Sequence, residues 1–181
     1  MQGDVPIAAG LSSSAAVEMA AVQAFSAVGG FAVPPEQAAR IGQKAEHTYV
    51  GTNCGLMDQL ASALGQPDHV LLIDCRDLSF QPVPTPAAAA ILIADTAVRR
   101  QLAASAYNER RAQCETAARA LGVPALRDAS LAMLERAEMP AVAARRARHV
   151  ITENERVLAT TAALRRGDLA AVGALMDASH A

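Results

Sequence analysis

The sequence predicts an α+β fold, in which helices and short strands intermix up to about residue 95 and the remainder is almost entirely helical. Short apolar runs at 69–74 and 80–83 predict two strands, because their Val and Ile side chains suit a pleated sheet. Beyond residue 96, apolar side chains recur at the spacing of one helix face. We therefore predict two regions, residues 1–86 and residues 87–181, with a soft boundary near residue 86.

The helix boundaries follow from start and stop signals. Gly29 and Gly30 end the first helix, and Pro34 and Pro35 begin the second, because glycine favours a helix end and proline suits the first turn. The predicted helices cover 12–28, 35–49, 56–64, 105–121, 131–137, 140–166 and 168–179, and a third strand is predicted over 91–94. The apolar stripe of the longest helix consists of Ala143, Ala147, Val150, Ile151, Val157, Leu158 and Leu164.

The composition argues against several classes of protein. Sixteen Lys and Arg residues against eighteen Asp and Glu residues give a formal net charge of −2, without the basic excess of most nucleic-acid-binding proteins. No apolar run reaches the roughly 18 residues of a membrane-spanning helix. Three cysteines without a Cys-x-x-Cys pair predict neither a disulfide framework nor a zinc site, and no signal peptide is visible. We expect a cytoplasmic protein that binds neither nucleic acid nor membranes.

The segment from Pro6 to Ala16 combines small residues, a glycine and three consecutive serines at the start of a helix. Glycine lets a backbone approach a ligand closely, and the first N–H groups of a helix favour an anion such as phosphate. The serine hydroxyls could also ligate Mg²⁺, which prefers oxygen. An ordinary serine helix cap without a ligand explains the same residues about equally well. The segment is not a Walker loop, because no Gly-Lys pair follows.

Two carboxylates have both an ordinary and a functional interpretation. Asp58 falls in the first turn of a predicted helix, where the helix dipole alone stabilises a carboxylate by about 0.3–1 kcal/mol. In a partly apolar cleft, an ionised carboxylate can instead accept a proton from a hydroxyl group. In its ordinary interpretation, Glu46 is a solvated acid near Lys44 on the face of the second helix.

These segments resemble a known family. The run Pro-x-x-x-Gly-Leu-Ser-Ser-Ser-Ala at 6–15 is similar to the phosphate-binding motif of the GHMP small-molecule kinases. Further segments are similar to galactokinase signatures within that family, so the resemblance extends over nearly the whole chain. These segments are Cys54–Leu60, His69–Arg76, Tyr107–Glu115, Arg146–Val150 and Ser179–His180.

The resemblance implies a two-lobed galactokinase, monomeric when complete, that phosphorylates D-galactose with ATP at the anomeric hydroxyl. It implies that Asp58 is the catalytic base and touches the sugar, that Ser14 and Glu46 ligate Mg²⁺, and that the backbone of Gly55 lies against the sugar. The implied ATP-binding residues are Ala8, Ala9, Gly10, Leu11, Ser12, Ser13 and Ser14. Residues 1–86 would belong to the nucleotide-binding N-terminal lobe, and residues 87–181 to the helical start of the C-terminal lobe.

Some features of the family are not found in this sequence. Its N-terminal sugar-binding motif would precede residue 1, and neither the aromatic sugar contact expected soon after His180 nor the glycine-rich third motif is present. We therefore expect a fragment that is inactive by itself. Three other functions stay open: a galactokinase-like sensor without turnover, a sister kinase acting on N-acetylgalactosamine, and a helical interaction domain without a ligand.

Overall fold

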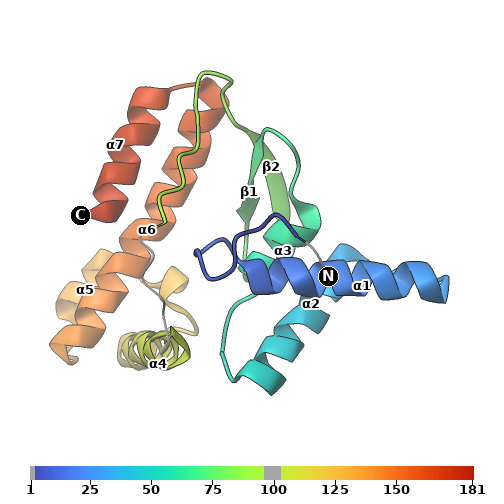
Figure 1. Cartoon of the computed structure of the whole chain (residues 1–181). Helices are drawn as coiled ribbons and strands as arrows, with labels where there is room; N and C mark the ends of the chain where they lie inside the picture. The colour runs from blue at the N-terminus through green and yellow to red at the C-terminus, as the bar shows by residue number, and fades with distance from the viewer. Residues whose placement is uncertain (1–2, 96–102) are drawn as a thin grey trace. The chain divides into compact units, whose positions relative to one another are not determined.

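The structure is a computed structural model that describes residues 3–95 and 103–181. The chain divides into two compact units, Met1–Ala104 and Ser105–Ala181. Its main elements are α1 (Ser13–Gly29), α2 (Pro35–Ala45), α3 (Met57–Leu64), β1 (His69–Ile73), β2 (Phe80–Pro84), α4 (Ala103–Leu121), α5 (Leu131–Arg136), α6 (Ala141–Arg166) and α7 (Leu169–His180) (Figure 1). The division into units lies later than residue 86, and the assignment of the two predicted regions to kinase lobes stays a prediction.

Each predicted helix forms, and all but one begin and end within two residues of the predicted bounds. The exception is the second helix. Its α-helical part ends at Ala45 and continues as a π-helical turn, η1 (Glu46–Val50). A short 3₁₀ turn, η2 (Leu126–Asp128), precedes α5. The mixed α+β architecture predicted from the sequence is therefore confirmed.

Two of the predicted strands form an antiparallel hairpin. Its register runs from His69 opposite Pro84 to Ile73 opposite Phe80. The predicted strand over 91–94 is wrong, because these residues lie in no strand, and Leu92 is 91% exposed. A strand needs a hydrogen-bonded neighbour as well as a suitable composition. Within the described residues, the sheet contains only β1 and β2, so nothing pairs with this apolar run.

The first unit is built on contacts among α1, α2 and α3. A small core joins Ala39 of α2 to Leu60 of α3 and to Leu78 in the turn of the hairpin. Ile73 of β1 packs against the same core, so the hairpin is anchored to the helices. This packing fixes the two loops that carry the predicted site, because one loop enters α1 and the other enters α3.

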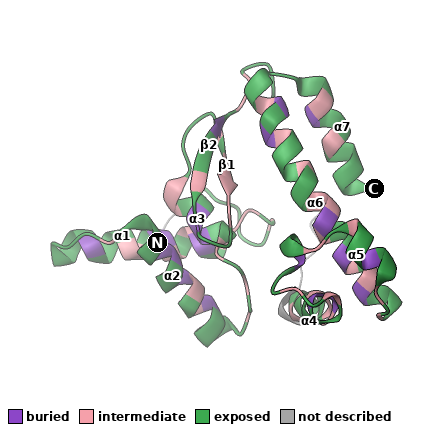
Figure 2. Ribbon diagram, turned by 180° about the vertical axis from the view of Figure 1, so that it is seen from behind, coloured by how far each residue is buried: buried purple, intermediate pink, exposed green. Residues whose placement is uncertain are grey.

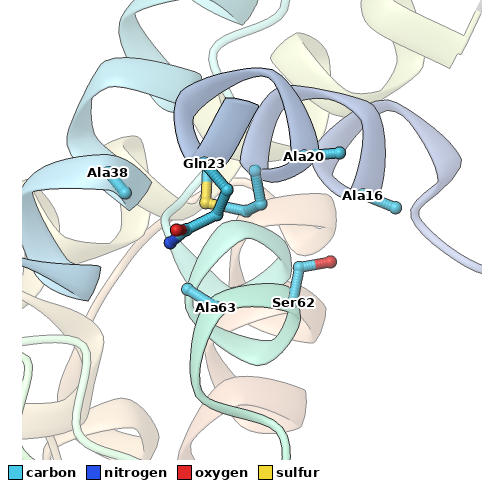
Figure 3. Close-up of a pocket in the computed structure, with 7 residues that line it drawn as sticks. Ala16, Ala20, Gln23, Ala38, Ser62 and Ala63 are labelled. Carbon is cyan, nitrogen blue, oxygen red and sulfur yellow. The ribbon is translucent and has the colours of Figure 1, made fainter. Parts of the chain in front are cut away.

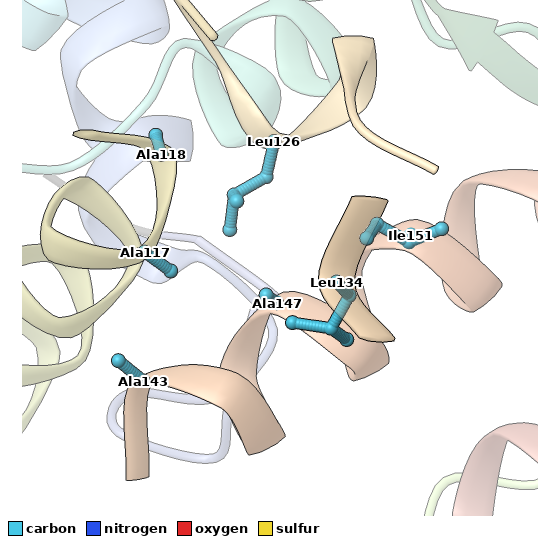
Figure 4. Close-up of a cluster of buried hydrophobic side chains, with 7 residues drawn as sticks. All are labelled: Ala117, Ala118, Leu126, Leu134, Ala143, Ala147 and Ile151. Carbon is cyan, nitrogen blue, oxygen red and sulfur yellow. The ribbon is translucent and has the colours of Figure 1, made fainter. Parts of the chain in front are cut away.

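The second unit has its own alanine-rich core (Figure 4). Small side chains let α4 and α6 approach closely there. The buried residues are Ala117, Ala118, Leu126, Leu134, Ala143, Ala147 and Ile151. The first half of the predicted stripe of α6 is thus confirmed. Val157 and Leu158 are instead 45% and 63% exposed, so the stripe is not buried along its whole length.

Much of the apolar surface of the first unit faces solvent. Most of α1 is coloured as exposed in Figure 2. Among its large apolar residues, Phe25 and Val28 are exposed. Among the described residues, no helix combines the length and apolar character needed to cross a membrane.

Candidate functional site

The serine loop has an unusual backbone. Alternate residues, Ala8, Gly10 and Ser12, have positive φ angles of 61°, 77° and 55°. Left-handed conformations cost energy for alanine and serine, and such strain is concentrated at functional sites. Successive N–H groups in such alternating backbones form concave anion-binding sites. Residues 8–14 are exposed or half-buried and lead directly into α1.

Ser12 does not cap its helix with its side chain. It precedes α1 in the N-cap position, yet its hydroxyl makes no capping hydrogen bond within the described residues. The ordinary cap interpretation therefore does not explain this serine. Ser14 lies in the first turn of α1 with its surface exposed. The backbone N–H groups and serine hydroxyls at this helix start thus remain available to a ligand.

Glu46 is buried, with only 8% of its surface exposed, so its interpretation as a solvated acid is wrong. It begins the π-helical turn η1, and its carbonyl oxygen accepts a hydrogen bond from the Gly51 N–H at 2.9 Å. The turn ends at Gly51 with a φ of 76°, a conformation that suits glycine. Single π-helical turns within helices are frequent at functional sites.

The loop between η1 and α3 is fixed by two side chains. The carbonyl oxygen of Cys54 lies 3.0 Å from Gln43 Nε2 and 3.0 Å from His47 Nε2. Because a carbonyl oxygen only accepts, His47 carries its proton on Nε2 in this arrangement. Both contacts come from one stretch of helix, since residues four apart share a face. They hold the backbone immediately before Gly55, which is exposed.

Asp58 lies in the first turn of α3, and its side chain is exposed. Its neighbour Gln59 is buried, with 2% of its surface exposed. Gln59 Nε2 donates a hydrogen bond to Glu18 Oε2 of α1 at 3.1 Å. This bond connects the helix of Asp58 to the helix that follows the serine loop.

The charges of three carboxylates act on the Cys54 thiol. Burial raises the pKa of the Cys54 thiol most, and the negative charges of Glu46, Glu18 and Asp58 raise it further. The thiol is therefore protonated at neutral pH and is a weak nucleophile. Burial also raises the pKa of Glu18, which the hydrogen bond from Gln59 lowers and the charge of Glu46 raises. The site accumulates negative charge, which favours a cation.

The predicted residues thus occupy neighbouring segments of one unit. Glu46 and Asp58 both act on Cys54, and Ser14 lies one helical turn before Glu18. Among the described residues, no group of three or more His, Cys, Asp or Glu side chains is placed to hold a metal ion. A cation here would need hydroxyl, water or ligand oxygens in addition to carboxylates.

A separate pocket of about 280 Å³ lies between α1, α2 and α3 (Figure 3). Its lining residues are Ala16, Met19, Ala20, Gln23, Ala38, Ser62 and Ala63. None of the predicted site residues lines it. The lining is made mostly of small apolar side chains, so the pocket offers little chemistry to a phosphate or a sugar.

Sequence reasoning missed four polar side chains whose hydrogen bonds hold the segments that carry the predicted site residues: Glu18, Gln43, His47 and Gln59. A signal existed for Glu18, which is the only charged residue in α1. Gln59 interrupts an otherwise apolar helix face, which is a weaker signal. The roles of Gln43 and His47 depend on the conformation of a loop and leave no periodic pattern in the sequence.

Known proteins share the features of this chain. Residues 1–66 match the GHMP kinases N terminal domain. The chain is 50% identical over 185 residues to a galactokinase of Pasteurella multocida, covering 99% of this chain and 48% of the relative. A galactokinase of Chloroflexus aurantiacus is 50% identical over 188 residues, with the same coverage. The crystal structure of Lactococcus lactis galactokinase complexed with galactose is similar with a TM-score of 0.87 at 29% identity, over 98% of this chain and 48% of that chain.

The chain spans about half the length of the curated relatives it matches. Within that half, the similarity covers the domain family, the sequence and the fold. It includes the serine loop, which lies inside the matched N-terminal domain. Along that half, the chain is similar in sequence and fold to galactokinases, and its residues 1–66 match the N-terminal domain of the GHMP kinases.

Proposed function

We propose that the complete gene product is a galactokinase, which transfers the γ-phosphoryl group of ATP to the anomeric hydroxyl of D-galactose. The observation that carries this proposal is the 50% identity to curated galactokinases along 99% of the chain. The geometry supports it, because a strained loop at a helix start and a group of carboxylates lie in the same unit. Phosphoryl transfer depends mainly on positioning and electrostatic stabilisation, which such an arrangement can supply.

We assign the triphosphate to residues 8–14. The alternating backbone of Ala8, Gly10 and Ser12 supports this assignment, because its N–H groups can line an anion site. The start of α1 adds the positive end of a helix dipole. The exposure of the loop leaves room for a ligand.

We assign the catalytic base to Asp58. Its exposed carboxylate stands three residues after Gly55, whose backbone would lie against the sugar. In this role, Asp58 accepts the proton of the anomeric hydroxyl as that oxygen attacks the γ-phosphorus. The bond from the γ-phosphorus to the bridging oxygen breaks, and ADP leaves.

We assign Mg²⁺ to Ser14 and Glu46. The donor set fits, since both groups offer oxygen, and the buried carboxylate of Glu46 adds to the negative charge around Cys54. Mg²⁺ is commonly bound by one or two protein groups together with phosphate oxygens and water. When bound, the ion would supply positive charge against the β- and γ-phosphates.

We further propose a cytoplasmic location. The three cysteines are free thiols in the structure, and they are distributed over both units. Free thiols persist in reducing compartments.

The test is a substrate panel on the complete gene product. ADP formation would be followed with D-galactose, N-acetylgalactosamine and D-glucose, with and without Mg²⁺. We expect Mg²⁺-dependent turnover of D-galactose, with galactose 1-phosphate identified by ³¹P NMR. Preference for N-acetylgalactosamine would indicate the sister kinase, and sugar binding without turnover would indicate a sensor. The absence of any thermal shift with Mg·ATP would favour an interaction domain.

A further inference from the structure

Three helices of the first unit meet at a single glycine. A Cβ atom on Gly42 of α2 would lie 2.6 Å from Glu18 Oε2, 2.9 Å from Met19 Cε and 3.1 Å from Gln59 Cγ. Gly42 itself is buried. The absence of a side chain there makes room for the hydrogen bond between Glu18 of α1 and Gln59 of α3.

Each of these helices carries one group of the proposed site. Ser14 lies one turn before Glu18 on α1, and Glu46 follows Gly42 by one turn along α2 and η1. Asp58 directly precedes Gln59 on α3. The Glu18–Gln59 hydrogen bond therefore links α1, which follows the proposed phosphate loop, to α3, which carries the proposed base. It does so next to Gly42 of α2, the helix that leads to the proposed metal ligand Glu46.

We propose that the Glu18–Gln59 hydrogen bond, which lies next to Gly42, holds Asp58 at a fixed position relative to the serine loop. The inference rests on the proposed function, because this relative position matters only if Asp58 and the loop act on the same substrate. Glu18 and Gln59 are positioning residues here. They act through Ser14 and Asp58 rather than on the substrate.

The hydrogen bonding of Gln59 favours this role over simple packing. Gln59 Oε1 is buried and has no partner among the described residues, so the amide is held by its one bond to Glu18. An apolar side chain would fill the same space without an unsatisfied atom. Burial raises the pKa of Glu18, so the partial burial of this carboxylate also costs free energy. A costly polar pair that joins two helices specifies their relative placement.

The test compares two variants of the complete gene product. The double variant Glu18→Met/Gln59→Met removes both polar groups together, which keeps the volume and leaves no unsatisfied partner. Glu18→Gln keeps an acceptor for Gln59 Nε2 and removes only the charge. Gln66→Met, on an exposed loop, is the matched control for a glutamine-to-methionine change.

We expect kcat of the double variant to fall by at least about tenfold, since a misplacement of about 1 Å can cost about a hundredfold. The KM values for ATP and galactose and the melting temperature should stay close to wild type. Glu18→Gln should retain most of kcat, and Gln66→Met all of it. A purely structural pair would instead lower the melting temperature and leave kcat of the folded protein unchanged.

Gly42→Ala provides an independent variant. Alanine favours a helix more than glycine, yet its Cβ would displace the Glu18 carboxylate. We expect lower kcat without a lower melting temperature. Wild-type kcat in the double variant or in Gly42→Ala would overturn the positioning role, as would an equal loss in Glu18→Gln. If the wild type phosphorylates galactose, such a result contradicts only the positioning role. If the wild type does not phosphorylate galactose, the proposed function fails, and the positioning role fails with it.

Discussion

At the scale of single residues, two buried polar side chains are not explained by apolar packing. Glu46 and Gln59 are both buried, although the helices around them are held together by alanine, leucine and methionine. Burying a carboxylate or an amide costs free energy unless partners compensate for lost water. Gln59 has a carboxylate partner, because its Nε2 donates a hydrogen bond to Glu18 Oε2.

The substitution Asp58→Asn tests the proposed base. Asparagine keeps the size and polarity of the side chain but cannot accept the proton of the sugar hydroxyl. We expect kcat to fall by about 10²–10⁴-fold, with the affinity for ATP largely unchanged. Steady-state kinetics and calorimetric ATP titration of the complete gene product would measure both quantities.

Asp68→Asn is the matched control for this substitution. Asp68 is exposed and has a φ of 58°, a conformation that asparagine also adopts readily. Its kinetics should match those of the wild type. Near-normal turnover in Asp58→Asn would exclude Asp58 as the base.

Leu60 is the residue whose truncation should most affect the first unit. It is fully buried between α2, α3 and the hairpin. Leu60→Ala would remove packing and leave a cavity, which costs about 2–5 kcal/mol of unfolding free energy. Leu60→Met conserves volume and should cost less than about 1.5 kcal/mol. Urea denaturation would measure the free energy of unfolding of both variants. An equal loss of unfolding free energy in the two variants would contradict this packing of Leu60.

At the scale of elements, a hydrogen bond to the Glu153 carboxylate connects α6 and α7. Ser179 Oγ donates to Glu153 Oε1 at 2.6 Å, and Arg156 Nε donates to Glu153 Oε2 at 2.7 Å. The bond from Ser179 is the largest cause that lowers the pKa of Glu153 below its ordinary value of 4.5, with the Arg156 bond and charge adding to it. The bond therefore links the end of α7 to the middle of α6.

The pH dependence of this pair follows from the direction of the shift. A carboxylate with a lowered pKa in the folded state stabilises the protein above its ordinary pKa, and the contribution is lost as pH falls through the folded value. Ser179→Ala should raise the pKa of Glu153 and lower stability at pH 7, with the difference from wild type vanishing in acid. Carboxyl NMR titration and thermal unfolding would measure these effects. Ser179→Thr keeps the hydroxyl and should behave as wild type; an unshifted Glu153 in Ser179→Ala would show that the bond is not formed in solution.

At the scale of the whole molecule, α1 is apolar on two sides. One side carries the buried Ala15 and Met19, whereas Val17, Phe25 and Val28 are 49%, 74% and 90% exposed. Their spacing places these three on one face. A helix that is apolar all round is normally enclosed in a core. The exposed face of α1 therefore calls for a covering element that the described residues do not supply.

We predict that residues 1–181 alone do not phosphorylate galactose. The chain spans 48% of the galactokinases it matches, and transfer requires the sugar and the γ-phosphate to be held in near-attack geometry. The exposed face of α1 should also make the isolated chain self-associate. An ADP-release assay and sedimentation would test both expectations, with the complete gene product as the control. Galactose-dependent ADP release by the isolated chain, abolished by Asp58→Asn, would contradict the prediction.

The local elements could be predicted because their signals are local. The helix bounds follow from Gly30, Pro35 and Gly167 and from apolar spacing within each segment. The serine loop and Asp58 could be proposed for the same reason, since a family motif is a run of neighbouring residues. The failed strand at 91–94 shows the limit of this approach, because an apolar run does not reveal whether another strand lies beside it.

Only the tertiary structure decided how these elements meet. It buried Glu46, for which the ordinary interpretation of the sequence is a solvated acid, and placed it at the start of a π-helical turn. It also paired Glu18 with Gln59 across 41 residues and placed Gly42 beneath them. Such contacts depend on the distance between helices, which the spacing of residues within one helix does not encode. The sequence by itself determined the elements and the resemblance to galactokinases, whereas the packing of α1, α2 and α3 determined which polar side chains lie beside the proposed site residues.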